Sequence, residues 1–229
     1  MKKLSLVIAE SALELIPDEI RRAPAVVNDA KRRGERDPSR ILLDRSIHHA
    51  AMLRLKEDYK RGRPDIVYLT LLNITETPLY EEGLLDVYVH TRNDEVLEIA
   101  ERTRLPKSYF RFRNLMEKHL SEKSSTELIL MHEGMSIREL VRRIVKADAV
   151  IGLSVQGESR ELGGLAQELV GKRSPCVLIG GFPHGHYSEA TLGELDGLVR
   201  IHRRALDAHV VACRLLYEVE SATQEGKNQ

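Results

Sequence analysis

The sequence predicts an α/β protein whose sheet is mostly parallel. From Ala149 to Glu220, short apolar segments alternate with segments of helical periodicity, a pattern typical of βαβ units. The chain has 229 residues, of which 42% are hydrophobic, enough for one domain with a substantial core. Glycines gather directly after two of the predicted strands, where open α/β sheets bind ligands. We therefore expect a single domain over residues 1–220.

The first half of the chain begins with a buried strand at Leu4–Ala9 and then becomes less regular. An amphipathic pattern, broken at Pro17 and Pro24, fades into the polar segment 31–40, which we expect to be an exposed basic loop. The near-continuous apolar run that follows Asp65 is typical of a strand covered on both faces. The elements expected here are a short strand at Ile41–Leu43, a helix at Ser46–Tyr59, and strands at Ile66–Leu72, Leu85–His90 and Val96–Ile99.

The second half has clearer boundaries. Pro106 suits the first turn of a helix that runs to about Leu120, and Ser136 with Glu139 forms a capping-box pair that opens another. We expect residues 65–120 to include an embellishment of the sheet. The polar end, Ser221–Gln229, is expected to be a disordered tail. The other expected elements are strand Glu127–Met131, helix Ile137–Lys146, strand Ala149–Ser154, helix Leu162–Val170, strand Pro175–Ile179, strand Leu198–Ile201 and helix Ala205–Glu220.

Composition and motifs restrict the possible functions. The 35 basic and 35 acidic residues balance, so a nucleic-acid site must be a local patch. No stretch is apolar enough to span a bilayer, and the N-terminus does not read as a signal peptide, so we expect a soluble cytoplasmic protein. His184 and His186 lack a third ligand, and we expect no metal. Sequence motifs of nucleophilic and metal-dependent hydrolases are missing.

The segment 101–113 combines five basic residues with one acidic residue. Tyr109, Phe112 and Met116 have the i, i+3, i+7 spacing of a buried helical stripe. Such a helix presents basic side chains to solvent, and a phosphate backbone is a suitable ligand for them. A solvated helix face without a ligand is the alternative. The basic ridge consists of Arg104, Lys107 and Arg111.

Two further features bear on chemistry. The late glycines allow a ligand to approach the backbone, although ordinary turn glycines would give the same pattern. Asp65, which follows Arg63 and Pro64, can orient a substrate or accept a proton, and it can equally form a salt bridge with Arg63. Methyl transfer from S-adenosylmethionine fits such a sequence, because the donor is already activated and positioning supplies much of the acceleration.

Four blocks of this sequence resemble a known family. They are RPDIVYLTLLNITETPLYEEGLLDVYVHT from Arg63, TRLPKSYFRFRNLM from Thr103, IGGFPHG from Ile179 and ALDAHVVACRLLYEVE from Ala205. In this order they are similar to the ribosome-biogenesis pseudouridine methyltransferases of the SPOUT superfamily, which methylate ring nitrogen N-1 of a pseudouridine in small-subunit rRNA. The resemblance covers roughly Leu4 to Glu220.

The resemblance implies a SPOUT-type sheet with a C-terminal trefoil knot and a family-specific insertion. It also implies an S-adenosylmethionine site, a homodimer and a stem-loop of 16S-type rRNA as substrate, with ribosomal or assembly proteins as further candidate partners. Periodicity does not indicate the knot, and general connection rules argue against one.

The motifs also assign candidate site residues. Lys107 stands where many relatives carry Arg, which keeps a phosphate contact but loses the planar fork. The RNA-contacting positions implied by the motifs are Arg63, Asp65, Arg104, Lys107 and Arg111, and Asp65 is also the candidate catalytic residue. The implied cofactor positions are Gly157, Gly180, Gly185, Ile201, His202, Arg203, Arg204, Ala205 and Leu206.

Two other functions remain compatible with the sequence. One is an rRNA-binding assembly factor without catalytic activity. The other is a SPOUT methyltransferase with a different acceptor, such as a tRNA base or a ribose hydroxyl.

Overall fold

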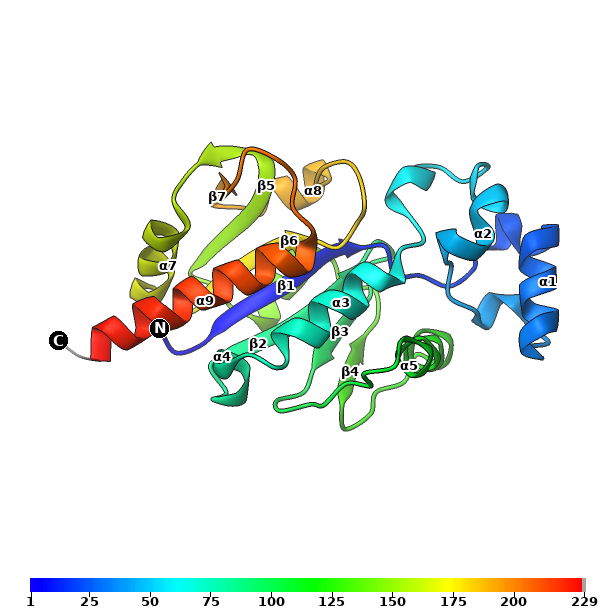
Figure 1. The fold of residues 1–229 in the computed structure, drawn as a ribbon, viewed down its shortest axis with the longest axis horizontal. Helices are drawn as coiled ribbons and strands as arrows, with labels where there is room; N and C mark the ends of the chain where they lie inside the picture. Colours follow the sequence, from blue (N-terminus) through cyan, green and yellow to red (C-terminus); the bar gives the residue numbers. More distant parts are fainter. Residues whose placement is uncertain (228–229) are drawn as a thin grey trace.

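The computed structural model describes residues 1–227 and confirms a mixed α/β fold around one seven-stranded sheet (Figure 1). The strand order is β4-β3-β2-β1-β6-β5-β7. Strands β2, β1, β6, β5 and β7 pair in parallel in this order. Strand β3 pairs antiparallel with β2, and β4 pairs antiparallel with β3. The strands are β1 (Leu4–Ser11), β2 (Leu85–Thr91), β3 (Val96–Ile99), β4 (Ile129–His132), β5 (Ala149–Ser159), β6 (Pro175–Gly180) and β7 (Gly197–Arg200).

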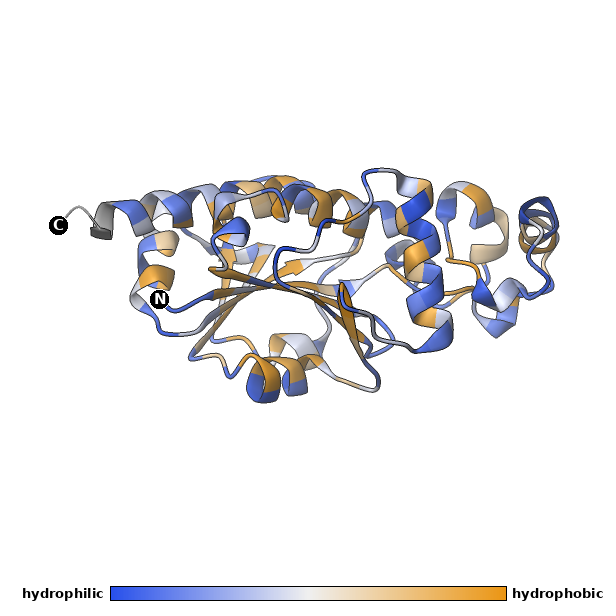
Figure 2. Cartoon of the chain, turned by 90° about the horizontal axis from the view of Figure 1, so that it is seen from below, coloured by the Kyte–Doolittle hydropathy of each residue, from blue (hydrophilic) through white to orange (hydrophobic). Residues whose placement is uncertain are grey.

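Helices cover both faces of this sheet (Figure 2). The long helix α9 packs against α3 and α7 on one face, and α6 with α8 lies on the other. A π-helical turn at Leu140–Ile144 continues α6. The helices are α1 (Pro24–Arg33), α2 (Arg45–Met52), α3 (Pro64–Ile74), α4 (Pro78–Glu81), α5 (Tyr109–Glu122), α6 (Ile137–Glu139), α7 (Leu162–Gly171), α8 (Glu189–Leu192) and α9 (Ala208–Lys227).

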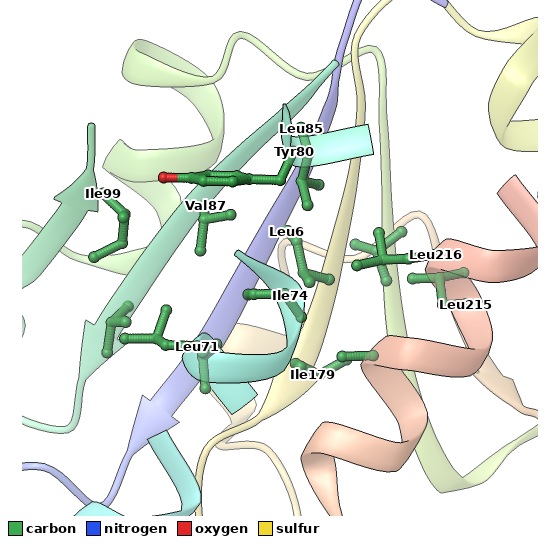
Figure 3. Close-up of a cluster of buried hydrophobic side chains, with 14 of the residues drawn as sticks. Leu6, Leu71, Ile74, Tyr80, Leu85, Val87, Ile99, Ile179, Leu215 and Leu216 are labelled. Carbon is green, nitrogen blue, oxygen red and sulfur yellow. The ribbon is translucent and has the colours of Figure 1, made fainter. Parts of the chain in front are cut away.

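Strand β1 lies at the centre of the molecule and has side chains buried on both faces. Leu6 faces the larger core, where Leu71 of α3 and Leu216 of α9 pack against it (Figure 3). Val7 faces the opposite core, together with Leu140 and Leu178. The predicted buried strand at the N-terminus is therefore confirmed, and it separates two hydrophobic cores that hold helices on either side.

The predicted strand Ile66–Leu72 is wrong, because this segment forms most of helix α3. Pro64 occupies the first helical turn and Asp65 follows it, which is a favourable helix start. Val67, Leu71 and Ile74 are fully buried at i, i+4 and i+7. Leu69 is 39% exposed and Ile66 and Leu72 are partly exposed, so apolar residues occupy the outer side of the helix as well. The hydrophobic pattern therefore does not reveal the helical period, and the sequence does not distinguish a helix from a buried strand here.

Several other boundaries differ from the predictions. The expected strand at Ile41–Leu43 is only an isolated bridge between Leu15 and Leu42. The helix expected at Ser46–Tyr59 ends at Met52, and the expected basic loop 31–40 contains the last turn of α1 and a 3₁₀ turn at Pro38–Arg40. Helix α9 begins at Ala208 and continues to Lys227, so most of the predicted disordered tail is helical. Residues 228–229 lie outside the described part of the chain.

Residues 12–62, between β1 and α3, form a lobe at one end of the molecule (Figure 1). The lobe has its own small core, which includes Ile20, Val26, Leu43 and Met52. This separate core explains why α1 and α2 can project from the sheet instead of covering it.

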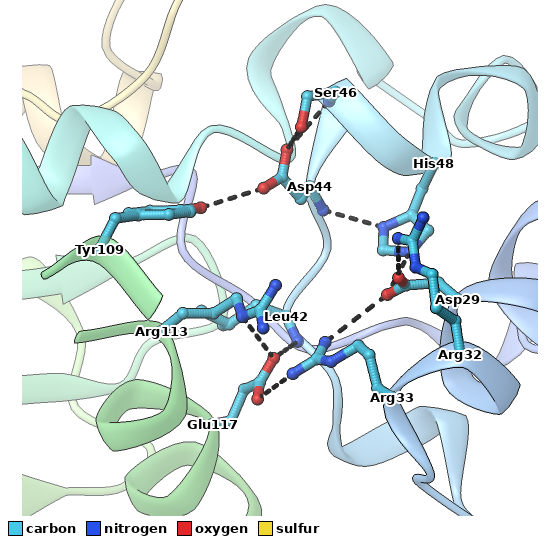
Figure 4. Close-up of polar contacts among 10 residues, drawn as sticks. All are labelled: Asp29, Arg32, Arg33, Leu42, Asp44, Ser46, His48, Tyr109, Arg113 and Glu117. Atoms are coloured by element: carbon cyan, nitrogen blue, oxygen red, sulfur yellow. Dashed lines mark hydrogen bonds and ion pairs between the residues drawn. The ribbon is translucent and has the colours of Figure 1, made fainter. Parts of the chain in front are cut away.

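Polar contacts fasten the lobe to helix α5 (Figure 4). The Tyr109 hydroxyl donates to Asp44 at 3.0 Å, and the Leu42 N–H donates to Glu117 at 3.0 Å. Within the lobe, His48 is fully buried and its Nε2 lies 3.5 Å from a carboxylate oxygen of Asp29. Burial lowers the pKa of His48, although the nearby carboxylates of Asp29 and Asp44 oppose this shift.

We predict that acidification destabilises the protein partly through His48. Because the pKa of His48 in the folded chain lies below its ordinary value of 6.5, the unfolded chain binds this proton more readily. The stabilising contribution is therefore complete above about pH 7 and is lost as the pH falls below about 6.5. Thermal unfolding between about pH 7.5 and 5.5 should show a smaller decrease in Tm for His48→Gln than for the wild type.

A matched control is His49→Gln, because His49 is exposed on the same helix. This variant should keep the wild-type pH dependence. Identical pH slopes for the wild type and His48→Gln would contradict the assignment.

Candidate cofactor pocket and nucleic-acid interface

A cavity of about 400 Å³ opens at the carboxyl edge of the parallel sheet. It lies beside residues 153–155 of β5 and beyond the ends of β6 and β7, and the N-terminal parts of α3 and α9 complete its wall. Its volume and position are those of a site for a small organic ligand. The lining residues are drawn from the segments 63–69, 153–155, 179–187 and 200–211, not all of whose members reach the cavity.

The loop after β6 is fixed to the end of β1. The Gly181 N–H donates to the Ala9 carbonyl, and the Gly181 carbonyl accepts from the Ala12 N–H, both at 2.8 Å. Farther along the loop, the Tyr187 hydroxyl is buried within 3.1 Å of the Leu153 carbonyl and 3.0 Å of the Leu178 carbonyl. Burial raises the pKa of Tyr187, so its hydroxyl remains a donor. These contacts hold one wall of the cavity in place.

The loop after β7 forms a second wall. In the backbone of residues 202–206, only Arg204 forms hydrogen bonds with other parts of residues 1–227. The Arg204 N–H donates to Nδ1 of the His202 imidazole at 3.2 Å, and the Arg204 carbonyl lies 3.3 Å from the same nitrogen. The loop thus leaves peptide donors and acceptors available beside an apolar surface formed by Leu153, Ile179 and Val211. Such a surface fits a flat heterocycle with polar edges, as in the adenosine part of S-adenosylmethionine.

Most of the predicted cofactor residues meet at this cavity. Gly180 and Gly185 line it from the β6 loop. The members of the β7 loop that line it are Ile201, His202, Arg204, Ala205 and Leu206. The structure does not bring Gly157 or Arg203 to the lining.

Gly157 lies instead where strands β5 and β7 approach each other closely. It lies at an irregularity where β5 loses and then regains its register with β7. A Cβ atom at this position would lie 2.5 Å from the backbone nitrogen of Val199 and 2.6 Å from the carbonyl of Leu198. Only glycine allows the two strands to approach this closely.

Arg63 and Asp65 lie at the cavity mouth, where Arg63 immediately precedes α3 and Asp65 is in its first turn. Arg63 donates to both Asp65 carboxylate oxygens, each at 2.8 Å, so the predicted salt bridge is confirmed. The hydrogen bond to Asp65 raises the pKa of the Arg63 guanidinium, although burial opposes this shift. Asp65 starts a helix, whereas we expected it at the mouth of a strand. Its role as a proton acceptor stays a prediction.

Asp207 is a lining residue that the sequence did not identify. We expected a helix from Ala205, which would have placed Asp207 inside it. The helix begins at Ala208 instead, so Asp207 stands just before its first turn and faces the same cavity as Asp65. An Asp preceding an apolar periodic segment is a recognisable helix-start signal, and it would have indicated this boundary.

The basic ridge lies outside the cavity. Arg104 and Lys107 precede α5, and Arg111 lies in its first turn; all three are exposed. The Lys107 ammonium is 3.4 Å from Glu76 in a solvent-exposed pair, which water and salt weaken. The ridge therefore presents cations that remain free to contact phosphates.

The predicted aromatic stripe is confirmed in part. Phe112 and Met116 are fully buried, whereas Tyr109 is half-buried. Phe110, which we did not single out, is 67% exposed, and the Arg113 guanidinium lies 5.3 Å from its ring centroid. An exposed aromatic beside cations suits contact with an unpaired base.

Helix α3 connects the ridge to the cavity. The Tyr68 ring packs against those of Tyr109 and Phe112, with centroids 5.4 and 5.1 Å away. Its hydroxyl donates to the Lys107 carbonyl. Because Asp65 and Tyr68 lie one turn apart on α3, the cavity mouth and the start of the ridge are adjoining parts of one surface.

Two kinds of feature are missing from residues 1–227. No helix there has the length and apolar character required to cross a bilayer. No three side chains of His, Cys, Asp or Glu in that range are arranged as a metal site.

We predict that Gly157→Ala destabilises the protein, because the methyl group would collide with the backbone of β7. The expected decrease in the free energy of unfolding is about 1–3 kcal/mol. Chemical denaturation measures this change. Gly164→Ala is the control, since a Cβ at Gly164 in α7 meets no atom within 4 Å and should stabilise by roughly 0.4–1 kcal/mol. Wild-type stability of Gly157→Ala would contradict the proposed steric role.

Comparisons with known proteins agree with this geometry. Residues 6–220 match the family described as EMG1/NEP1 methyltransferase. The chain is 44% identical over 200 residues to the "Ribosomal RNA small subunit methyltransferase Nep1" of Thermococcus onnurineus, an alignment that covers 86% of this chain and 90% of the relative. It is 40% identical over 221 residues to the protein of the same name from Thermococcus kodakarensis, with 96% and 98% coverage.

A solved structure is also similar. The crystal structure of Archaeoglobus fulgidus Nep1 bound to S-adenosylhomocysteine superposes with a TM-score of 0.85 and 38% sequence identity, covering 98% of this chain and 100% of that one. The family resemblance noted in the sequence is therefore confirmed. The chain belongs to the EMG1/NEP1 methyltransferase family.

Proposed function

We propose that this protein is an S-adenosylmethionine-dependent methyltransferase that modifies ring nitrogen N-1 of a pseudouridine in small-subunit rRNA during ribosome biogenesis. The main supporting observation is that a ligand-sized cavity and an exposed basic ridge adjoin through α3 in a member of this family. The similar Archaeoglobus fulgidus protein was crystallised with S-adenosylhomocysteine, which is the product left when S-adenosylmethionine loses its methyl group.

The cavity suits this cofactor on physical grounds. The apolar side chains of Leu153, Ile179 and Val211 would cover the two faces of an adenine ring, and the open peptide groups of residues 202–206 would bind its edge. When bound, the cofactor supplies a methyl group already activated on a sulfonium. The protein then has to exclude water and align the acceptor nitrogen with that methyl carbon.

Residues at the cavity mouth would position the acceptor base. The target nucleotide must leave its stack, because its ring nitrogen cannot otherwise reach the cavity. Asp65 holds the Arg63 guanidinium through two hydrogen bonds, and we infer that this pair orients the base or its phosphate. Asp65 would accept the N-1 proton on an oxygen lone pair that Arg63 does not occupy. Asp207 lies on the same cavity.

The same proposal includes an RNA-binding surface and further partners. The ridge of Arg104, Lys107 and Arg111, with Arg63, would bind the phosphates of a 16S-type rRNA stem-loop. A homodimer, a C-terminal trefoil knot, a cytoplasmic location and contacts with ribosomal or assembly proteins remain predictions from the family resemblance.

Two alternative functions differ from this proposal in what happens to the bound RNA. An assembly factor would bind rRNA without transferring a methyl group. A methyltransferase for another RNA would not distinguish pseudouridine from uridine.

Methyl transfer from labelled S-adenosylmethionine tests these alternatives directly. The substrates are two rRNA-loop oligonucleotides that differ only in carrying uridine or pseudouridine at one position. We expect label in the pseudouridine oligonucleotide alone. Equal labelling of both would favour another acceptor, and RNA binding without labelling across a panel of loops would favour the assembly factor.

We predict that Arg104→Ala weakens RNA binding about three- to tenfold, because one charge-assisted phosphate contact is lost. The slope of log K against log salt should become about one unit shallower. Binding of S-adenosylhomocysteine should not change, since Arg104 lies outside the cavity. Fluorescence anisotropy with a labelled oligonucleotide at several salt concentrations measures the affinity and its slope.

Lys118→Ala is a control, because Lys118 is exposed on α5, the helix that follows Arg104, but lies beyond the ridge. It should retain wild-type affinity. An Arg104→Ala protein with unchanged affinity and salt slope would remove Arg104 from the RNA site.

A further inference from the structure

Glu10 occupies an unusual place at the end of β1. Its φ is +49°, a left-handed conformation that a residue other than glycine adopts at an energetic cost. Its side chain is only 12% exposed. Such a conformation persists when the surrounding contacts require it, and it occurs often at functional sites.

The Glu10 carboxylate binds the end of the β6 loop. One oxygen accepts the Ser188 N–H at 2.7 Å, and the other lies 3.3 Å from the Lys60 ammonium. Burial raises the pKa of Glu10, but hydrogen bonds from Ser188 and Thr191 outweigh burial and lower it. The carboxylate therefore stays ionised and holds both partners.

Lys60 comes from the lobe, where it ends a 3₁₀ turn at Asp58–Lys60. Its ammonium donates to the His186 carbonyl and lies 4.7 Å from the ring centroid of Phe182. Its aliphatic stem also lies against the loop, since a Cβ at Gly185 would be 2.9 Å from Lys60 Cε. A single lobe side chain thus contacts the loop at three positions.

Both partners lie outside the cavity lining, whereas Phe182, Gly185 and His186 are part of it. Glu10 and Lys60 can therefore influence a bound ligand only through the loop. The loop is fixed at its start by the hydrogen bonds of Gly181. Its later part, 182–188, depends on the buried hydroxyl of Tyr187 and on this ion pair.

We propose that Glu10 and Lys60 are positioning residues for cofactor binding, which set the shape of the β6 loop and make the lobe a structural part of the cofactor site. This inference rests on the proposed function, because it takes S-adenosylmethionine as the ligand of the cavity. Without the pair, the loop samples more conformations, and the ligand must order it on binding. The affinity for the cofactor then falls although every lining residue is unchanged.

Isothermal titration with S-adenosylhomocysteine tests the proposal on the full-length protein. Lys60→Met retains most of the aliphatic stem but removes the charge. We expect Kd to rise about tenfold, comparable to the loss of one charge-assisted hydrogen bond. Lys60→Arg, which can still donate to the His186 carbonyl, should recover most of the affinity.

Lys56→Met is the matched control, because Lys56 is exposed in the same lobe four residues earlier. The Lys56→Met variant loses the same positive charge, and it should bind S-adenosylhomocysteine with the wild-type Kd. Glu10→Gln should also weaken binding. The double variant Glu10→Gln/Lys60→Met should weaken it by less than the product of the two single effects, because both changes break the same pair.

Two further readouts separate positioning from general destabilisation. RNA affinity without cofactor should stay within twofold of the wild type for Lys60→Met. In the methylation assay, KM for S-adenosylmethionine should rise more than kcat falls. Unchanged Kd in Lys60→Met and Glu10→Gln would overturn the inference, as would an equal loss in Lys56→Met. If the wild type itself bound no S-adenosylhomocysteine, the proposed function would fail first.

Discussion

The burial of β1 on both faces is the constraint on which the rest of the structure depends. This strand pairs in parallel with β2 on one side and β6 on the other. Its two sets of side chains divide the protein into two cores, one beneath α9 and one beneath α6. At the carboxyl end of β1 the chain leaves the sheet for the lobe, and the residues there bind the loop after β6.

That exit links the sheet, the lobe and the cavity. The backbone of Ala9 and Ala12 binds Gly181, and the side chain of Glu10 binds Ser188. The chain then forms the lobe and returns at Arg63, whose N–H donates to the Ala12 carbonyl at 3.1 Å. The cavity mouth and the cavity wall are therefore built on the same few residues at the end of one strand. The basic ridge joins this arrangement through α3, on which both Asp65 and Tyr68 lie.

The sequence predicted those features that depend on local periodicity or on motifs. The strands at Leu85 and Val96 and the Ser136–Glu139 capping box are confirmed, because neighbouring residues alone determine them. Gly180, Gly185 and most of the 201–206 segment, which the family motifs assign to the cofactor, line one cavity, and their contact with the cofactor stays a prediction. The mistaken strand at Ile66–Leu72 shows the limit of this approach, since the exposed side of α3 carries apolar Leu69 within this run and no polar face reveals the helical period.

Features that depend on distant residues could not be read from the sequence. Lys60 and His186 are 126 positions apart, and Glu10 and Ser188 are 178 apart. No local pattern indicates such pairs, and the lobe core is likewise assembled from short segments without strong periodicity. The role of Gly157 was also hidden, because the close approach of β5 and β7 appears only once both strands are in register.

Hydrogen exchange with and without S-adenosylhomocysteine would test most directly that this cavity is the cofactor site. We expect slower exchange on ligand addition in the three segments that line it, at 153–156 in β5, at 180–188 after β6 and at 201–209 after β7, and unchanged exchange in α1 of the lobe. Protection that is absent from these loops, or that occurs only elsewhere in the protein, would contradict the assignment.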